Sequence, residues 1–183
     1  GTMRTPPDSD AQIALDPRSF RRIYREHHDF VWRSVQRLGV EAAAVDDVIQ
    51  EVFLAAYRRF DTYDPRRPFK PWLFGIALNV VRMARRSESR HRRRVEAVQQ
   101  HPPDPTDATQ QHAALDLLDR LLAALDDDQR TVVILIEIEG MTPRDVAAGL
   151  GLRVNTVYSR LRLARAHLHR TAARQSAREA RSA

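Results

Sequence analysis

The chain has 183 residues and a mass of 21.0 kDa, which is enough for one ordinary domain or two small ones and excludes a large multidomain enzyme. It carries 30 basic and 24 acidic residues for a net charge of +6, and every basic residue except Lys70 is arginine. The absence of cysteine excludes a disulfide scaffold, a thiolate metal site and a cysteine nucleophile, and a reducing cytoplasm is the expected location. The sequence contains no run of about 18 apolar residues, so it predicts no membrane insertion. Residues 1–17 are expected to be flexible, and Gly1-Thr2 resembles a tag remnant.

The charge is unevenly distributed along the chain. Residues 18–94 carry a net charge of +9 and residues 140–170 a net charge of +5, whereas residues 95–112 carry −3 and residues 116–139 carry −5. Two separated arginine-rich surfaces favour a partner with extended negative charge, and a nucleic acid is the obvious one. The alternative is an arginine-rich surface that is simply well solvated.

Three amphipathic helices are predicted before residue 87. Asp16-Pro17 is a helix-start signal, and apolar residues recur at helical spacing from Phe20 to Leu38 until Gly39 stops the pattern. A second stripe covers residues 41–60, and a third covers residues 68–86, where Trp72, Leu73, Ile76, Ala77, Val80 and Met83 are expected to turn inward. These helices predict one small domain.

The apolar periodicity disappears from residue 87 to about residue 111, which indicates a linker, and it resumes at Leu115. Asp126-Asp127-Asp128 then opens another helix. Clustered acids at a helix start act far more often as caps than as a cation site. Residues 132–138 are rich in β-branched side chains and resemble a strand, but their helical neighbours and the lack of a pairing partner favour a helix.

Residues 142–168 match a helix-turn-helix. Thr142 and Pro143 start a short helix, Gly151 permits a tight left-handed turn, and a second helix begins near residues 154–156 and continues to about residue 168. In this arrangement Thr156, Tyr158, Ser159 and Arg162 would face the major groove of DNA, while Arg144, Arg160 and Arg165 would meet phosphates or base edges. A generic helical hairpin with solubilising arginines is the alternative.

The two halves together resemble an extracytoplasmic-function (ECF) sigma factor of the bacterial sigma-70 family, a class that keeps only the sigma-2 and sigma-4 domains. Residues 46–53 are similar to the acidic D-x-x-Q-E-x-F helix of that family, residues 68–79 to its F-x-x-W-L-x-x-I-A-x-N segment, and residues 156–161 to its recognition helix. The resemblance implies an all-α fold with a sigma-2-like bundle at residues 18–94 and a four-helix sigma-4-like domain at residues 113–170. A flexible linker at residues 95–112 and a flexible basic tail at residues 171–183 complete the expected organisation.

The resemblance also implies functions for individual residues. The polar side of the second helix would bind the clamp helices of the largest polymerase subunit, through Asp46, Asp47, Gln50 and Glu51. The minus-ten promoter element would be read and melted by Phe69, Lys70, Trp72, Asn79, Arg82, Arg85 and Arg86. The minus-35 element would be read by Arg144, Asn155, Thr156, Tyr158, Ser159, Arg160, Arg162 and Arg165. Further implied partners are the flap of the second-largest polymerase subunit and an anti-sigma factor.

Several interpretations stay open at this point. Trp72 either stacks at the edge of melted DNA or belongs to the core, and Phe53 is expected in the core rather than at a contact. The acidic linker either mimics nucleic-acid charge or is a plain tether. A stand-alone helix-turn-helix regulator that binds duplex DNA without polymerase is the alternative function. An enzyme is disfavoured: His27-His28 and His167-Leu168-His169 lack the i, i+4 spacing of a zinc site, so we expect no cofactor, metal or catalytic residue.

Overall fold

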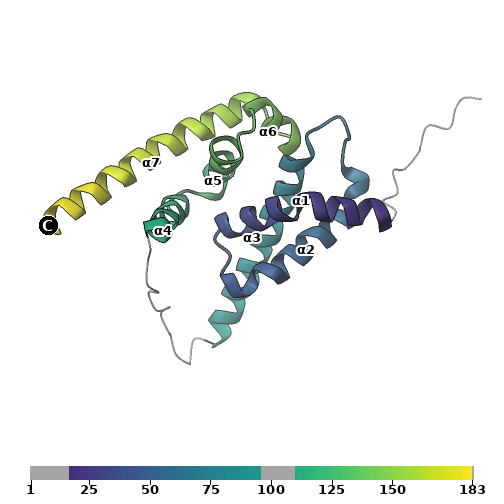
Figure 1. The fold of residues 1–183 in the computed structure, drawn as a ribbon, viewed down its shortest axis with the longest axis horizontal. Helices are drawn as coiled ribbons and strands as arrows, with labels where there is room; N and C mark the ends of the chain where they lie inside the picture. The colour runs from purple at the N-terminus through teal and green to yellow at the C-terminus, as the bar shows by residue number, and fades with distance from the viewer. Residues whose placement is uncertain (1–16, 96–109, 183) are drawn as a thin grey trace, which may run out of the picture.

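The computed structural model describes residues 17–95 and 110–182, and these ranges contain helices and turns but no strand. The first half consists of α1 (Pro17–Arg37), α2 (Val45–Arg58) and α3 (Phe69–Val95), with single 3₁₀ turns η1 (Ala42–Ala44) and η2 (Phe60–Thr62). The second half consists of α4 (Gln110–Ala123), α5 (Asp127–Val132), the π-helical segment η3 (Val133–Ile138), α6 (Pro143–Leu150) and α7 (Val154–Ser182). Figure 1 shows the two halves and the long α7 that leads to the C-terminus. The all-α prediction is confirmed.

The first half is a bundle in which α1, α2 and α3 contact one another. Each helix contributes the apolar stripe that its sequence predicts, and Phe53 is buried at 2% exposure, as expected for a core residue. The prediction for Met83 is wrong, because its side chain is 68% exposed. The inward stripe of α3 runs through Leu73, Ala77 and Val81, and Met83 lies about 200° around the helix from Val81.

Two helices extend further than their apolar patterns predict. The third helix was expected to end near residue 86 but continues to Val95, and the basic tail expected to be flexible is helical through Ser182. Neither extension contains glycine or proline. Both contain several arginines and the α7 extension is also rich in alanine, and these two residue types are good helix formers. Neither extension carries an apolar stripe, so periodicity could not predict these ends.

The turns of the second half follow the predicted capping pattern. The Asp126 side chain accepts a hydrogen bond from the Gln129 backbone N–H at 2.7 Å, which confirms its cap role. The Thr142 hydroxyl accepts one from the Asp145 N–H at 3.1 Å, and Gly151 adopts the left-handed φ of 67° that the tight turn needs. The β-branched segment after α5 is helical, as we favoured, although its turn is of the wider π type.

The two halves pack against each other where α3 crosses α6. Glycine allows the close approach at this crossing: a Cβ at Gly149 would lie 2.5 Å from the Pro71 Cβ, and one at Gly75 would lie 3.3 Å from Leu150 Cδ2. The buried apolar residues of both halves form one continuous cluster. This packing decides which of the predicted site residues meet solvent and which meet the other half.

Candidate functional site

The acidic face of α2 is open to solvent. Asp46, Asp47, Gln50 and Glu51 are all exposed, and their spacing of one and four residues places them on one side of the helix. The two aspartates lie in the first turn of α2, where the positive end of the helix dipole favours carboxylates. The Glu51 carboxylate lies 3.7 Å from the Arg58 guanidinium, an exposed pair that contributes little stability. The surface therefore presents negative charge to solvent.

A groove between α2 and α3 adjoins this face. Its cavity of about 520 Å³ has an apolar floor that includes Val48, Ile76 and Met83, and its rim carries Asp47, Glu51 and Asn79. The structure thus places Asn79, predicted to border a base pocket, beside residues predicted to bind polymerase. An apolar floor with a polar rim can accept either a flat base or an apolar side chain.

The predicted stacking residues belong to an aromatic cluster at the start of α3. The Trp72 ring centroid lies 5.1 Å from that of Tyr63 and 5.3 Å from that of Phe69, and Phe60 packs beside them. Trp72 and Phe69 are half-buried, so each ring supports the core with one part and meets solvent with another. The Lys70 ammonium lies 5.6 Å from the Phe30 ring centroid. Both interpretations of Trp72 are compatible with this geometry.

His27 packs against this aromatic cluster. Its ring centroid lies 4.8 Å from that of Phe69, and its buried Nδ1 has no hydrogen-bond partner among the described residues. Burial lowers the pKa of His27 by penalising the charged ring; Glu26 acts in the opposite direction, and the Lys70 charge lowers the pKa further. The fold therefore favours the neutral imidazole.

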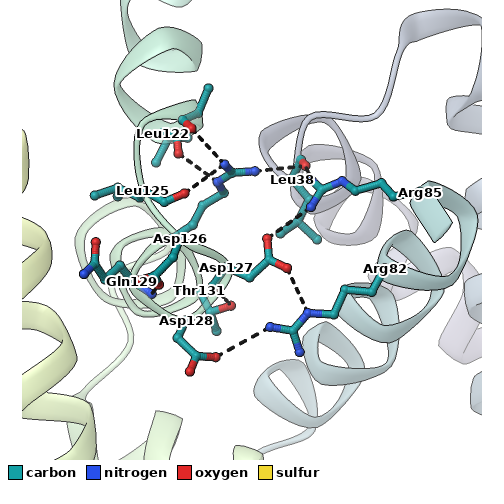
Figure 2. A network of polar contacts seen from close by, with 12 residues as sticks. Leu38, Arg82, Arg85, Leu122, Leu125, Asp126, Asp127, Asp128, Gln129 and Thr131 are labelled. Atoms are coloured by element: carbon teal, nitrogen blue, oxygen red, sulfur yellow. Dashed lines mark hydrogen bonds and ion pairs between the residues drawn. The ribbon is translucent and has the colours of Figure 1, made fainter. Parts of the chain in front are cut away.

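The arginines predicted to hold minus-ten phosphates lie on another side of α3 and meet α5. Arg82 Nε donates to Asp127 Oδ2 at 2.8 Å and Arg85 Nη1 donates to Asp127 Oδ1 at 3.1 Å, and Figure 2 shows both contacts. Burial acts to raise the pKa of Asp127, but the hydrogen bonds and charges of the two arginines outweigh it and hold the pKa below its ordinary value. The structure therefore does not gather the predicted minus-ten residues in one place. Arg86 is exposed one turn further along α3.

Arg130, which sequence reasoning missed, binds the ends of two helices. It is 8% exposed, and its guanidinium donates to the carbonyls of Leu122 and Ala123 at the end of α4, of Leu125 just after α4 and of Leu38 just after α1, at 2.8 to 3.3 Å. Arg85 donates to the same Leu38 carbonyl (Figure 2). These carbonyls lie at the C-terminal ends of α4 and α1, where the helix leaves acceptors without intrahelical donors, so Arg130 acts as a shared C-cap between the two halves.

A second polar contact between the halves involves Glu139, at the end of η3. Arg33 donates to it at 3.2 and 3.1 Å and Arg37 donates at 2.6 Å, so one carboxylate joins η3 to α1. Burial alone would raise the pKa of Glu139, but the hydrogen bonds and charges of both arginines lower it. Glu139 was also not predicted as a site residue.

The helix-turn-helix presents a hollow along the start of α7. A cavity of about 810 Å³ is lined by Asn155, Tyr158, Ser159, Arg162 and Arg165, together with Pro143 of α6. The structure therefore brings five of the eight residues predicted to read the minus-35 element to one surface. Arg144 is exposed, whereas Thr156 is half-buried.

Two arginines of α7 are held by acids of the second half. Arg160 Nη2 lies 2.7 Å from Asp128 Oδ2, and Arg165 Nε donates to Glu137 Oε1 at 2.9 Å. Asp128 also lies 3.6 Å from Arg82 of α3, so it contacts cations of both halves. Across residues 17–95 and 110–182, no group of histidines and acids is arranged to hold a metal ion. No helix in those ranges is long and apolar enough to cross a membrane.

The family models and the relatives that match this chain all point to one protein family. The family model for sigma-70 region 2 matches residues 23–91 and that for sigma-70 region 4 matches residues 115–168. The chain is 32% identical to the RNA polymerase sigma factor CnrH of Cupriavidus metallidurans, over 89% of this chain and 94% of CnrH. It is 34% identical to the ECF RNA polymerase sigma factor SigL of Mycobacterium tuberculosis, over 82% of this chain and 87% of SigL.

Two solved structures share the fold. CnrH, solved in complex with the cytosolic domain of CnrY, matches with a TM-score of 0.63 at 31% identity, over 85% of this chain and 88% of that one. The sigma factor RpoE of Bartonella quintana, solved with the anti-sigma factor NepR, matches with a TM-score of 0.66 at 24% identity, over 84% of this chain and 96% of that one. Both family models describe regions of sigma-70 factors, and these relatives are sigma factors. The comparisons therefore do not support the alternative of a stand-alone regulator.

The first prediction concerns Arg130. Replacement by methionine keeps an apolar stem but removes four hydrogen bonds, including those to the Ala123 and Leu125 carbonyls, and we expect the free energy of unfolding to fall by about 3 kcal/mol. Urea denaturation followed by circular dichroism measures the change. Arg120→Met on exposed α4 is the matched control and should change the free energy by less than about 0.5 kcal/mol. Equal losses in the two variants would contradict the shared-cap role.

The second prediction concerns pH. Because the pKa of His27 is lower in the folded than in the unfolded chain, the unfolded state binds more protons as the pH falls below the unfolded value of about 6.5. Neutral His27 therefore contributes fully to the stability of the folded state above that pH. This stabilisation is lost as the pH falls toward the lower pKa of the folded state. Urea midpoints measured between about pH 5 and 8 should fall less steeply on acidification in His27→Gln than in the unsubstituted protein. Parallel pH profiles would rule the effect out.

Proposed function

This chain belongs to the ECF group of sigma-70 family RNA polymerase sigma factors, and we propose that it directs promoter-specific transcription initiation. In this function it binds core RNA polymerase and recognises the minus-35 and minus-ten promoter elements. The observation that carries the proposal is the separation of two exposed polar surfaces, the acidic face of α2 and the hollow at the start of α7. Each lies in a segment that matches a sigma-70 region.

The acidic face of α2 is the proposed contact with the clamp helices of the largest polymerase subunit. Asp46, Asp47, Gln50 and Glu51 offer carboxylate and amide oxygens on one exposed side, which suits arginine-rich helices. The groove beside it, whose apolar lining includes the exposed Met83, enlarges the surface available to a partner. The flap of the second-largest subunit is the proposed partner of the second half.

The start of α3 and the groove are the proposed contacts with the minus-ten element. Exposed parts of Phe69 and Trp72 suit stacking with unpaired bases, and Asn79 at the groove rim suits the edge of a flipped base. Lys70, Arg82, Arg85 and Arg86 would bind the phosphates of the opened strand. Arg82 and Arg85 must leave Asp127 to do so.

The helix-turn-helix is the proposed reader of the minus-35 element. Tyr158, Ser159 and Arg162 line the hollow and have the donors and acceptors that base edges in the major groove require. Asn155, Thr156 and Arg144 lie at the start of the two helices, where helix N-termini commonly meet the DNA backbone. Arg160 and Arg165 would bind phosphates after leaving Asp128 and Glu137.

Sigma factors are not enzymes, and we assign this chain neither a catalytic residue nor a cofactor. The proposed place of action is the cytoplasm, where core polymerase works. Control by an anti-sigma factor is part of the proposal, supported by the relatives CnrH and RpoE, which were solved with CnrY and NepR. Residues 18–94 and 113–170 are the proposed sigma-2 and sigma-4 domains.

The third prediction tests polymerase binding. In the variant Asp47→Arg/Glu51→Arg, reversed charges on exposed positions should weaken binding to core RNA polymerase of the source organism at least about tenfold, or ~1.4 kcal/mol, without changing the circular dichroism spectrum. Glu41→Arg/Asp61→Arg makes the same change in net charge at exposed positions outside α2 and should bind normally. Biolayer interferometry gives both affinities. Equal weakening of the two variants would exclude a specific α2 contact.

The fourth prediction tests promoter recognition. The protein with core polymerase should initiate from a subset of a genomic promoter library, and neither component alone should do so. Arg162→Ala should reduce initiation about tenfold at the selected promoters, because a base or phosphate contact worth about 1 to 3 kcal/mol is lost. Arg170→Ala, an exposed position further along α7 and outside the hollow, is the control. Library-wide inactivity with core polymerase would overturn the proposed function.

A further inference from the structure

The acidic turn, residues 126–128, does more than cap a helix. Asp127 binds Arg82 and Arg85 of α3, and Asp128 binds Arg160 of α7 and lies near Arg82. All three arginines are proposed here to bind promoter phosphates. We infer that Asp127 and Asp128 compete with DNA for these arginines and hold the free chain in a closed arrangement, in which α3 packs on α6 and the ion pairs are formed. This inference rests on the proposed function.

The geometry of the contacts supports competition rather than simple surface pairing. The two oxygens of Asp127 receive one arginine each, at 2.8 and 3.1 Å, as the two free oxygens of a phosphodiester would. Figure 2 shows both acids on the first turn of α5, with Asp127 facing Arg82 and Arg85 and Asp128 facing Arg82. Each arginine side chain remains between 26% and 39% exposed, so DNA can reach the cations as the acids leave.

The closed arrangement has a second, independent set of contacts. At the α3–α6 crossing, Gly149 packs on Pro71 so closely that no side chain fits. Arg130 and Glu139 add hydrogen bonds from the second half to the end of α1. The polar contacts among these can be replaced by water and salt when the halves separate.

Competition lowers the affinity of the free chain for DNA in a defined way. If only a fraction of molecules is open, the apparent dissociation constant rises by the inverse of that fraction. A closed form favoured about tenfold therefore weakens binding of free protein to DNA about tenfold. Any partner that binds only the separated halves would remove this penalty.

The first arm of the test removes the competing charges. Asp127→Asn/Asp128→Asn keeps side-chain size, and its affinity for a fluorescein-labelled single-stranded oligonucleotide of mixed sequence, measured by anisotropy at fixed salt, should rise about tenfold. Asp116→Asn/Asp126→Asn changes the net charge equally, retains a good cap residue at position 126 and touches none of the three arginines. We expect at most a twofold gain for it, from general electrostatics.

The second arm opens the interface without changing any charge. Gly149→Ala favours helix α6 itself but brings a methyl group against Pro71 and the Pro68 carbonyl. Because the chain has no cysteine, spin labels at Gln36→Cys and Ala166→Cys report the distance between the halves by pulsed electron paramagnetic resonance. Gly149→Ala should lengthen that distance and strengthen oligonucleotide binding, whereas Ala148→Ser, on the exposed side of α6, should change neither.

The outcomes separate this inference from the proposed function. Equal oligonucleotide affinities of the Asp127→Asn/Asp128→Asn and Asp116→Asn/Asp126→Asn variants would overturn the competition. An unchanged label distance and affinity in folded Gly149→Ala would overturn the closed arrangement. Either result leaves promoter-dependent initiation with core polymerase intact, and the proposed function fails only when that initiation is absent.

Discussion

The packing of the two halves depends on how Arg130 is accommodated. A buried guanidinium costs free energy unless its donors are satisfied, and here they are satisfied by the last carbonyls of α1 and α4. Those carbonyls need donors for the same reason, since helix C-termini leave their acceptors unpaired. The same hydrogen bonds therefore offset the desolvation of the guanidinium and that of the carbonyls. They form only while the end of α1 lies beside the turn between α4 and α5. Its charge, together with Arg85, also explains why the acid Asp127 is placed nearby.

The sequence predicted well whatever depends on local patterns. The apolar stripes of α1, α2 and α3 located the first bundle, and the caps at Asp126, Thr142 and Gly151 located the turns of the second half. It failed where no local pattern exists. The ends of α3 and α7 carry no apolar stripe, and Met83 follows Ile76 and Val80 at helical spacing although its side chain is exposed.

The contacts between the two halves could not be predicted from the sequence, because they depend on the tertiary packing rather than on local patterns. Arg33 and Glu139 are 106 residues apart, and nothing in either neighbourhood specifies the other. The acceptors of Arg130 are backbone carbonyls, which every residue carries, so they leave no mark in the sequence. The one available signal was an arginine two residues before the apolar run of residues 132–136, which indicates a buried charge but does not identify its partner. The exposed faces of α2 and α7 were easier to place, because exposure follows from helix periodicity alone.

The uneven charge of the sequence follows from this architecture. Two basic segments, residues 18–94 with a net charge of +9 and residues 140–170 with a net charge of +5, would repel each other if they packed directly, and the repulsion grows as the charged surfaces lose water. Residues 116–139, with a net charge of −5, supply the acids that meet arginines from both sides, at Asp127, Asp128 and Glu139. Both basic surfaces can therefore stay strongly positive for a nucleic acid while the free chain remains compact. Without these acids, the two basic segments could pack together only if they carried fewer arginines. Because the acids lie between the two segments, the halves can pack while both segments keep their positive charge.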